Sequence, residues 1–359
     1  MTKLVNVSVC LTDVPGGTCR FDSYPHSFKK PIYKAVGCSE CENTGFKGRL
    51  SIGEVFGLVS LESVKQGVRG IRGDATTPKH VWDLSTLKIL QPSVSIKTWL
   101  KLGRTDKRIP IYNYFNRTPV SQENGYSLRV SQVQDFRGGQ QTYDSHQGTD
   151  FIIPVGTTVT AAAPGVVVRV EREFDRGGLS VMLLHSHGLI TTHNHLGRPL
   201  VQVGDEVKRG QPIAISGASG LDFVTSFFLS PPHVHFNTWL NGQSVDPFAI
   251  GDEDSLWLNG NQPLPSHGDT PSEELVDVDA LFDKEAVSAG IEQCLDADMR
   301  RMLNGFAWLP ERAAHLIYQR NYRPSKFSGF ETVYRENHVR VPYLNLPFQS
   351  CDVSGLILD

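Results

Sequence analysis

Residues 179–193 read LSVMLLHSHGLITTH, and this stretch decides the fold class. Two runs of apolar and β-branched residues flank a short Ser-His-Gly turn in its middle. Similar runs, separated by Gly or Pro, lie at 159–163, 166–171, 201–207 and 212–216. Short strands at this spacing, with turns and no amphipathic helix between them, predict an antiparallel β-barrel or sandwich.

The whole chain of 359 residues is long enough for two or three domains. Mixed short runs and four of the six cysteines indicate an α+β N-terminal domain over 1–115, followed by the β domain over 116–250. Residues 251–275 are rich in Gly, Pro and Asp, which predicts a linker or a long surface loop. Apolar residues at helical spacing predict a small, mostly helical C-terminal region over 276–359.

Charge and hydropathy exclude several classes of protein. The formal net charge is −3, so no global field favours nucleic acid or a membrane surface. No apolar run is long enough to span a bilayer. The first ten residues, MTKLVNVSVC, lack the apolar run of a secretory signal. The sequence therefore predicts a protein without a transmembrane segment or a signal peptide.

Histidines concentrate in three short motifs of the β segment. They read HQGTD at 146–150, HNHL at 193–196 and PHVHF at 232–236. In an extended strand, His233 and His235 point to the same face and can reach one small site. Neutral imidazole and carboxylate are ligands of catalytic zinc ions, and spare imidazoles can carry protons near neutral pH. The motifs together predict a divalent metal site with additional titratable groups.

In their order and flanking residues, these motifs resemble the M23 family of zinc metallopeptidases, the lysostaphin-type peptidoglycan endopeptidases. The resemblance covers residues from about 124 to 247. The matching stretches are 146–151, 163–167, 187–196, 203–213, 216–220 and 232–236. The resemblance implies a mostly β catalytic domain of the M23 type.

The family's functional residues transfer to five positions of this chain. The resemblance implies that His146, Asp150 and His235 are ligands of one catalytic Zn²⁺ ion. It also implies that His195 and His233 are catalytic. On this basis we expect a zinc-dependent endopeptidase that hydrolyses peptide cross-links of bacterial peptidoglycan through a zinc-bound water.

Two positions depart from the family pattern. His193 stands where the family often has Tyr, and Asn237 stands where an acidic residue is common. Neither change removes a ligand or a catalytic imidazole, so the chain is expected to be an active enzyme. Some family members have lost zinc ligands, which keeps a non-catalytic peptidoglycan-binding or hydrolase-activating module as one alternative. A peptidase acting on Gly-rich peptides outside the cell wall is another.

The resemblance also bears on partners and location. The expected partner is a peptidoglycan peptide and not nucleic acid, with room for an immunity, activator or secretion partner. Without a signal peptide, we expect action in the periplasm or outside the cell after non-classical export, or otherwise in the cytoplasm. In this family an N-terminal segment can occupy the groove or supply a fourth zinc ligand. Asn113, Asn116 and residues 135–144 are candidates by their proximity in sequence.

A second metal site is predicted among the N-terminal cysteines. Residues 37–55 contain a C-x-x-C pair and resemble half of the tetracysteine zinc element of type II secretion ATPases. The other half is missing, and the absence of a phosphate-binding Gly-Lys-Ser/Thr loop excludes an ATPase. The hypothesis is a structural zinc ion held by Cys10, Cys19, Cys38 and Cys41. The alternatives are a turn held by packing alone, or disulfides in an exported protein.

Overall fold

In the computed structural model, the chain forms two compact units, Met1–Val55 and Phe56–Asp359. It describes residues 8–9, 46–47, 61–73, 78–102, 106–119, 125–174, 177–221, 228–266 and 277–358. In the first unit, β1 (Ser8–Val9) pairs antiparallel with β2 (Phe46–Lys47). The cysteines of the predicted second zinc site, Cys10, Cys19, Cys38 and Cys41, lie outside the described residues.

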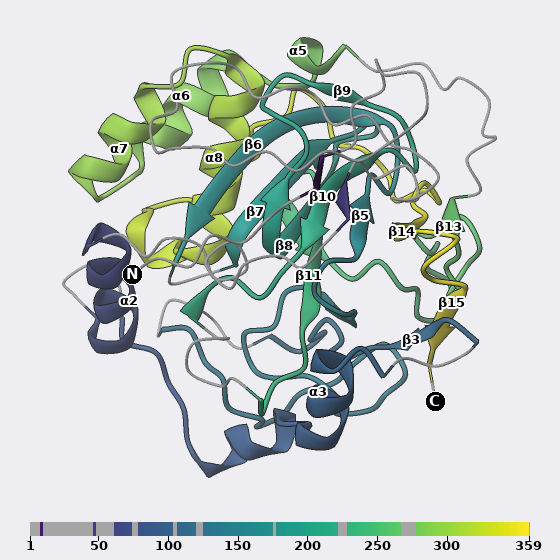
Figure 1. The fold of residues 1–359 in the computed structure, drawn as a ribbon. Coiled ribbons are helices and arrows are strands. Elements are labelled where there is room, and N and C mark those ends of the chain that lie inside the picture. Colours follow the sequence, from purple (N-terminus) through teal and green to yellow (C-terminus); the bar gives the residue numbers. More distant parts are fainter. Residues whose placement is uncertain are drawn as a thin grey trace. The chain divides into compact units, whose positions relative to one another are not determined.

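The second unit is built on a large sheet (Figure 1), which contains eleven strands among the described residues. The strands are β4 (Thr149–Ile152), β5 (Thr158–Thr160), β6 (Gly165–Glu173), β7 (Gly178–Leu184), β8 (Leu189–Pro199), β9 (Glu206–Val207), β10 (Pro212–Ser216), β11 (His233–Leu240), β12 (Gln243–Val245), β13 (Pro265–Ser266) and β14 (Leu346–Gln349). Their order is β13-β14-β5-β10-β8-β7-β6-β9, and β11 joins β8 to β4 and β12. The predicted mostly β domain is confirmed, whereas closure of the sheet into a barrel is not.

The sheet is buried on both faces, as the alternation of side chains along β7 shows. Val181 and Leu183 belong to one apolar cluster, while Met182 and Leu184 belong to a second. Successive strand residues point to opposite faces, so the two clusters lie on the two sides of the sheet. The second cluster consists of sheet residues together with apolar residues of the C-terminal helices.

The C-terminal region is helical, as predicted, and its helices group along β6 (Figure 1). They are α5 (Val278–Leu281), α6 (Lys284–Glu292), α7 (Ala297–Asn304), α8 (Leu309–Tyr322) and η4 (Pro324–Lys326). Asp283 and Asp296 accept hydrogen bonds from the first free N–H groups of α6 and α7, which sets where these helices begin. Pro310 lies in the first turn of α8, where its missing N–H costs nothing.

A buried ionic cluster joins α8 to β6. Arg169 is 1% exposed, and its Nη2 atom lies 3.1 Å from Glu173 Oε1. Glu173 Oε2 lies 3.3 Å from Nη2 of Arg323, the residue that follows α8. The guanidinium of Arg169 also stacks 3.7 Å from the ring centroid of Tyr318. The helical region is therefore held to the sheet by charge as well as by apolar contact.

The remaining elements lie outside the large sheet. They are α2 (Leu61–Arg72), η2 (Leu84–Ile89), α3 (Pro92–Trp99), β3 (Arg108–Pro110) and β15 (Gly355–Ile357). β15 pairs in parallel with β3, so the last part of the chain returns to the residues before the β domain. Among the described helices, none has the length and apolar character needed to cross a membrane. The domain boundaries at 115, 250 and 275 stay predictions.

Candidate metal centre

The predicted ligands come from β4, β11 and the turn before β4. The two strands pair antiparallel, and their register places His235 directly opposite Asp150. Directly opposed residues in an antiparallel pair have neighbouring side chains on one face. His233 lies two residues earlier on β11 and therefore faces the same side. Strand pairing thus brings residues 85 positions apart into one site.

The three side chains converge on a common point. Asp150 Oδ1 lies 2.7 Å from His235 Nδ1 and 3.1 Å from His146 Nε2, and the two imidazole nitrogens are 3.2 Å apart. All three residues are buried. Zinc ligands in tetrahedral geometry lie about 3.3 Å from one another, given bonds of about 2.0–2.1 Å. Two imidazole nitrogens and one carboxylate oxygen at these separations fit a zinc ion.

Two hydrogen bonds orient these side chains toward this point. His146 Nδ1 lies 2.6 Å from the carbonyl oxygen of Tyr114, so it donates there and leaves Nε2 facing Asp150 and His235. Asn113 Nδ2 donates to Asp150 Oδ2 at 3.0 Å, which leaves Oδ1 facing the imidazoles. Such partners orient metal ligands and fix the tautomer of a histidine. The sequence reasoning missed these orienting contacts, because they link the site to a separate segment.

Asn116, the other asparagine singled out from the sequence, has a backbone role. Its Nδ2 donates to the carbonyl oxygens of Tyr143 and Asp144, and its own N–H donates to the carbonyl oxygen of His146 at 3.0 Å. Asp144 accepts hydrogen bonds from Ser127 and Ser131. These contacts brace the turn that carries His146.

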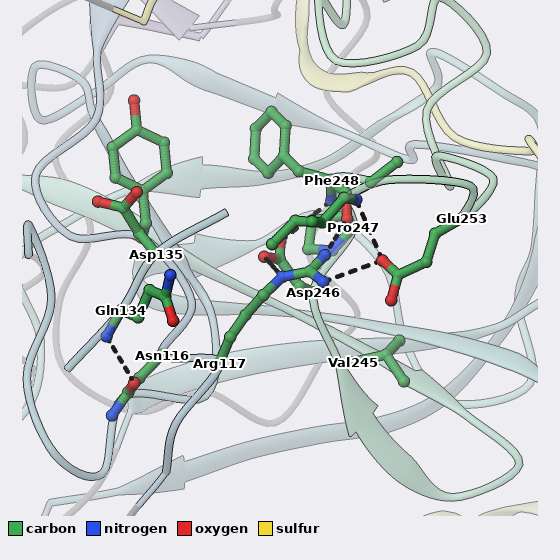
Figure 2. A network of polar contacts seen from close by, with 12 residues as sticks. Asn116, Arg117, Gln134, Asp135, Val245, Asp246, Pro247, Phe248 and Glu253 are labelled. Atoms are coloured by element: carbon green, nitrogen blue, oxygen red, sulfur yellow. Dashed lines mark hydrogen bonds and ion pairs between the residues drawn. The ribbon is translucent and has the colours of Figure 1, made fainter. Parts of the chain in front are cut away.

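Arg117 anchors the same segment to the loop after β12, as Figure 2 shows. Its Nε lies 2.7 Å from Asp246 Oδ2 and its Nη1 lies 2.9 Å from Glu253 Oε2. Its Nη2 donates to the carbonyl oxygen of Phe248. The segment that supplies Asn113 and the Tyr114 carbonyl is therefore fixed at its C-terminal end by an ion-pair network.

The electrostatics of the site favour a charged carboxylate. Burial opposes the ionisation of Asp150, but the surrounding His146, His233 and His235 hold the pKa of Asp150 well below its usual value. Burial lowers the pKa of His233, and the nearby Asp150 opposes this effect in part. An anionic oxygen surrounded by imidazole rings is a suitable environment for a cation.

His195 and His233 lie beside the three converging side chains. Their ring centroids are 4.9 Å apart in an edge-to-face arrangement, and His233 Nε2 lies 3.7 Å from Asp150 Oδ1. His195 Nδ1 is 2.8 Å from the carbonyl oxygen of Ser219, and His233 Nδ1 is 2.8 Å from that of Pro231. Each Nδ1 donates to a carbonyl, so each Nε2 keeps its lone pair for proton transfer.

A β-bulge turns His195 toward the site. Between β7 and β8, the pairs Val181–His193 and Leu179–Leu196 enclose one extra residue on β8. The backbone of His195 is in the left-handed region, with φ of 59°. Strict alternation would place His195 on the face opposite Asn194, but the bulge re-aims it. The sequence motif alone contains no signal for this irregularity.

His193 is not part of the metal centre. Its ring packs on the core side against Phe236, with centroids 5.1 Å apart, and its Nδ1 lies 3.4 Å from the carbonyl oxygen of Val181. Burial lowers the pKa of His193 to about 3. It stays neutral at physiological pH and serves as a core side chain.

Comparison with known proteins relates this part of the chain to a peptidase family. The model of the family described as Peptidase family M23 matches residues 144–247, which include all five predicted site residues. The match begins just before His146 and ends just after β12. The chain therefore contains a peptidase M23 domain.

Similar curated proteins match only part of this chain. An uncharacterized metalloprotease of Haemophilus influenzae is 36% identical over 105 residues, which are 29% of this chain and 21% of that protein. Peptidoglycan DD-endopeptidase ShyC of Vibrio cholerae is 37% identical over 106 residues, covering 30% of this chain and 23% of its own. The chain thus spans less than a quarter of the length of these relatives.

Solved structures show the same partial likeness. A zinc-containing peptidase from Vibrio cholerae is 29% identical, covers 38% of this chain and 36% of its own, and has a TM-score of 0.29. The catalytic domain of lysostaphin from Staphylococcus simulans is 33% identical, with a TM-score of 0.25. It covers 28% of this chain and 75% of its own.

Proposed function

We propose that this protein is a zinc-dependent endopeptidase that hydrolyses peptide cross-links of bacterial peptidoglycan. The observation that carries the proposal is the convergence of His146 Nε2, Asp150 Oδ1 and His235 Nδ1 beside two further imidazoles. The relatives named as peptidoglycan DD-endopeptidases support the choice of substrate. Action in the periplasm or outside the cell follows from this substrate and belongs to the same proposal.

The three converging side chains hold the metal. A zinc ion bound there supplies Lewis-acid polarisation of the scissile carbonyl and lowers the pKa of a water molecule. The hydrogen bonds from His146 to Tyr114 and from Asn113 to Asp150 keep the donor atoms aimed at the ion. The pairing of β4 with β11 keeps Asp150 and His235 at a fixed separation.

His195 and His233 perform the proton transfers. Each has its Nδ1 held by a backbone carbonyl, so the ring is oriented and the Nε2 is the reactive atom. The lowered pKa of His233 keeps it neutral and able to accept the proton of the attacking water. The Nε2 that has taken up this proton can donate a hydrogen bond to the developing oxyanion and then passes the proton to the leaving amine.

The test is zinc content together with digestion of purified peptidoglycan, for the wild type and three variants. We expect zinc and released muropeptides for the wild type, neither for His235→Ala, and zinc without digestion for His195→Ala. His187→Asn is the control, because His187 is exposed at a turn with φ of 60°, which Asn tolerates.

Two outcomes would redirect the proposal. Equal zinc content in the wild type and His235→Ala would refute the ligand assignment. Zinc in the wild type with no digestion would favour a non-catalytic wall-binding module. Soluble Gly-rich peptides added to the assay separate a wall-directed enzyme from a peptidase with another substrate.

A further inference from the structure

The sheet face that carries the metal centre continues beneath the C-terminal helix α8. His233, His235 and Asn237 alternate along β11 and therefore share this face. The hydroxyl of Tyr322, the last residue of α8, donates to Asn237 Oδ1 at 2.8 Å. Trp239, the next residue on that face, packs edge-on against the Tyr322 ring. The helix thus reaches the strand two residues beyond His235.

The carboxamide of Asn237 makes three hydrogen bonds. Its Oδ1 accepts from Tyr322 and, at 2.9 Å, from Asn194 Nδ2. Its Nδ2 donates to the carbonyl oxygen of Gln147 at 2.9 Å. Asn194 Nδ2 also lies 3.3 Å from the carbonyl oxygen of His235. Asn194 and Asn237 are fully buried and Tyr322 is 7% exposed, so these bonds are shielded from water.

This network touches every segment that supplies a histidine to the site. Gln147 follows the ligand His146, and Asn194 precedes His195. Asn237 itself lies two residues after His235. The side chain at position 237 must accept from two donors and also donate to a carbonyl. An amide can do both, whereas a carboxylate at this position could not donate to Gln147. This requirement explains why Asn stands at position 237.

We propose that Tyr322 is a positioning residue of the metal centre, which acts through Asn237 on the segments that hold His146, His195 and His235. The C-terminal helical region then helps to set the geometry of the metal centre. The inference rests on the proposed function, since it assigns a role toward the bound metal.

The experiment compares the wild type with Tyr322→Phe, Asn237→Ala, the double variant and the control Tyr334→Phe. Tyr334 is a buried tyrosine of the same region whose hydroxyl has no hydrogen-bond partner among the described residues. The zinc dissociation constant is measured by competition with a chromophoric chelator, well below each melting temperature. The kcat and KM for peptidoglycan fragments and the thermal midpoint are measured in parallel.

We expect the zinc dissociation constant to rise about 3- to 10-fold in Tyr322→Phe, the effect of one lost buried hydrogen bond. In Asn237→Ala it should rise about 10- to 100-fold, as for residues that orient metal ligands. The kcat should fall with KM unchanged. The double variant should match Asn237→Ala, because Tyr322 acts through that residue. Tyr334→Phe should behave as the wild type in every measurement.

If Tyr322→Phe keeps the zinc affinity and kcat of the wild type, this inference is overturned while the proposed function stands. Additive effects in the double variant would have the same consequence. A wild type that binds no zinc would overturn the proposed function and the inference together. Asn237→Ala removes the same hydrogen bond from the strand side, so the test does not depend on the folding of one variant. A lower thermal midpoint with unchanged zinc affinity would show a purely structural role.

Discussion

At the scale of single residues, Asn113 decides which oxygen of Asp150 faces the imidazoles. Its amide holds Oδ2 at 3.0 Å, so Oδ1 is left to face His146 and His235. Both Asn113 and Asp150 are at most 2% exposed, and water therefore has little access to replace the bond. The loss of this contact frees the carboxylate to rotate.

Asn113→Ala is expected to weaken zinc binding about 10- to 100-fold, the usual range for a residue that orients a metal ligand. Chelator competition on the folded variant measures this change. Asn259→Ala is the control, because Asn259 is exposed and, within the part of the chain that the structure describes, its side chain bonds only the nearby backbone of Gln262. An unchanged zinc affinity in Asn113→Ala would mean that the strand pairing alone orients Asp150.

The histidines differ in whether their placement follows from local sequence. The imidazoles at 233 and 235 were predicted to share a face from the two-residue period of a strand, and the structure places them so. Of the two imidazoles in the HNHL motif, the family resemblance implies a catalytic role only for His195. The structure places His193 in the core and His195 beside His233. The difference arises from the bulge in β8, which depends on pairing with β7.

At the scale of elements, the contact between β6 and α8 depends on Glu173. The side chain of Glu173 is 14% exposed and bonds both Arg169 and Arg323. Burial opposes its ionisation, but the two guanidinium groups lower the pKa of Glu173 from 4.5 to about 2. Its folded-state pKa is depressed, so its contribution to stability is present above pH 4.5 and is lost as the pH falls toward 2.

Glu173→Gln should therefore lower the free energy of unfolding by about 3 kcal/mol at pH 7. The difference in free energy of unfolding between the variant and the wild type should decrease as the pH approaches 2, since the wild-type carboxylate is then protonated. Chemical denaturation at several pH values from 7 down to 3 measures both effects. Glu292→Gln is the control, because its ion pair with Arg300 is exposed and 4.0 Å long. A difference in free energy of unfolding that does not change with pH would contradict the ionic role of Glu173.

At the scale of the whole molecule, the proposed metal site links ion binding to folding. Its three candidate ligands lie on two strands and a turn, so a bound ion would join segments that are distant in sequence. Zinc should raise the thermal midpoint of the wild type, with a stabilisation of about 2.7 kcal/mol at a free zinc concentration 100 times the dissociation constant. The midpoint of His235→Ala should not respond to zinc or to chelator. A scan of thermal midpoint against free zinc distinguishes these cases.

The C-terminal region is also needed for the core. β14 belongs to the main sheet, and Leu344, Leu346 and Phe348 are fully buried in the same cluster as Phe151. A chain that ends at residue 276 should lose its near-ultraviolet circular dichroism signal, because it exposes both faces of the sheet. A chain that begins at Phe56 should keep this signal, since residues 56–359 form a separate compact unit. A folded protein ending at residue 276 would contradict this account.

The sequence by itself determined the kinds of donor atom, the short strands and the two-residue spacing that puts His233 and His235 on one face. These properties are local, because they depend on side-chain chemistry and backbone periodicity within a few residues. Only the tertiary structure decided that Asp150 lies opposite His235, that His195 turns inward and that Tyr322 reaches Asn237. These contacts join residues up to 85 positions apart, and strand register, bulges and helix packing depend on the whole fold.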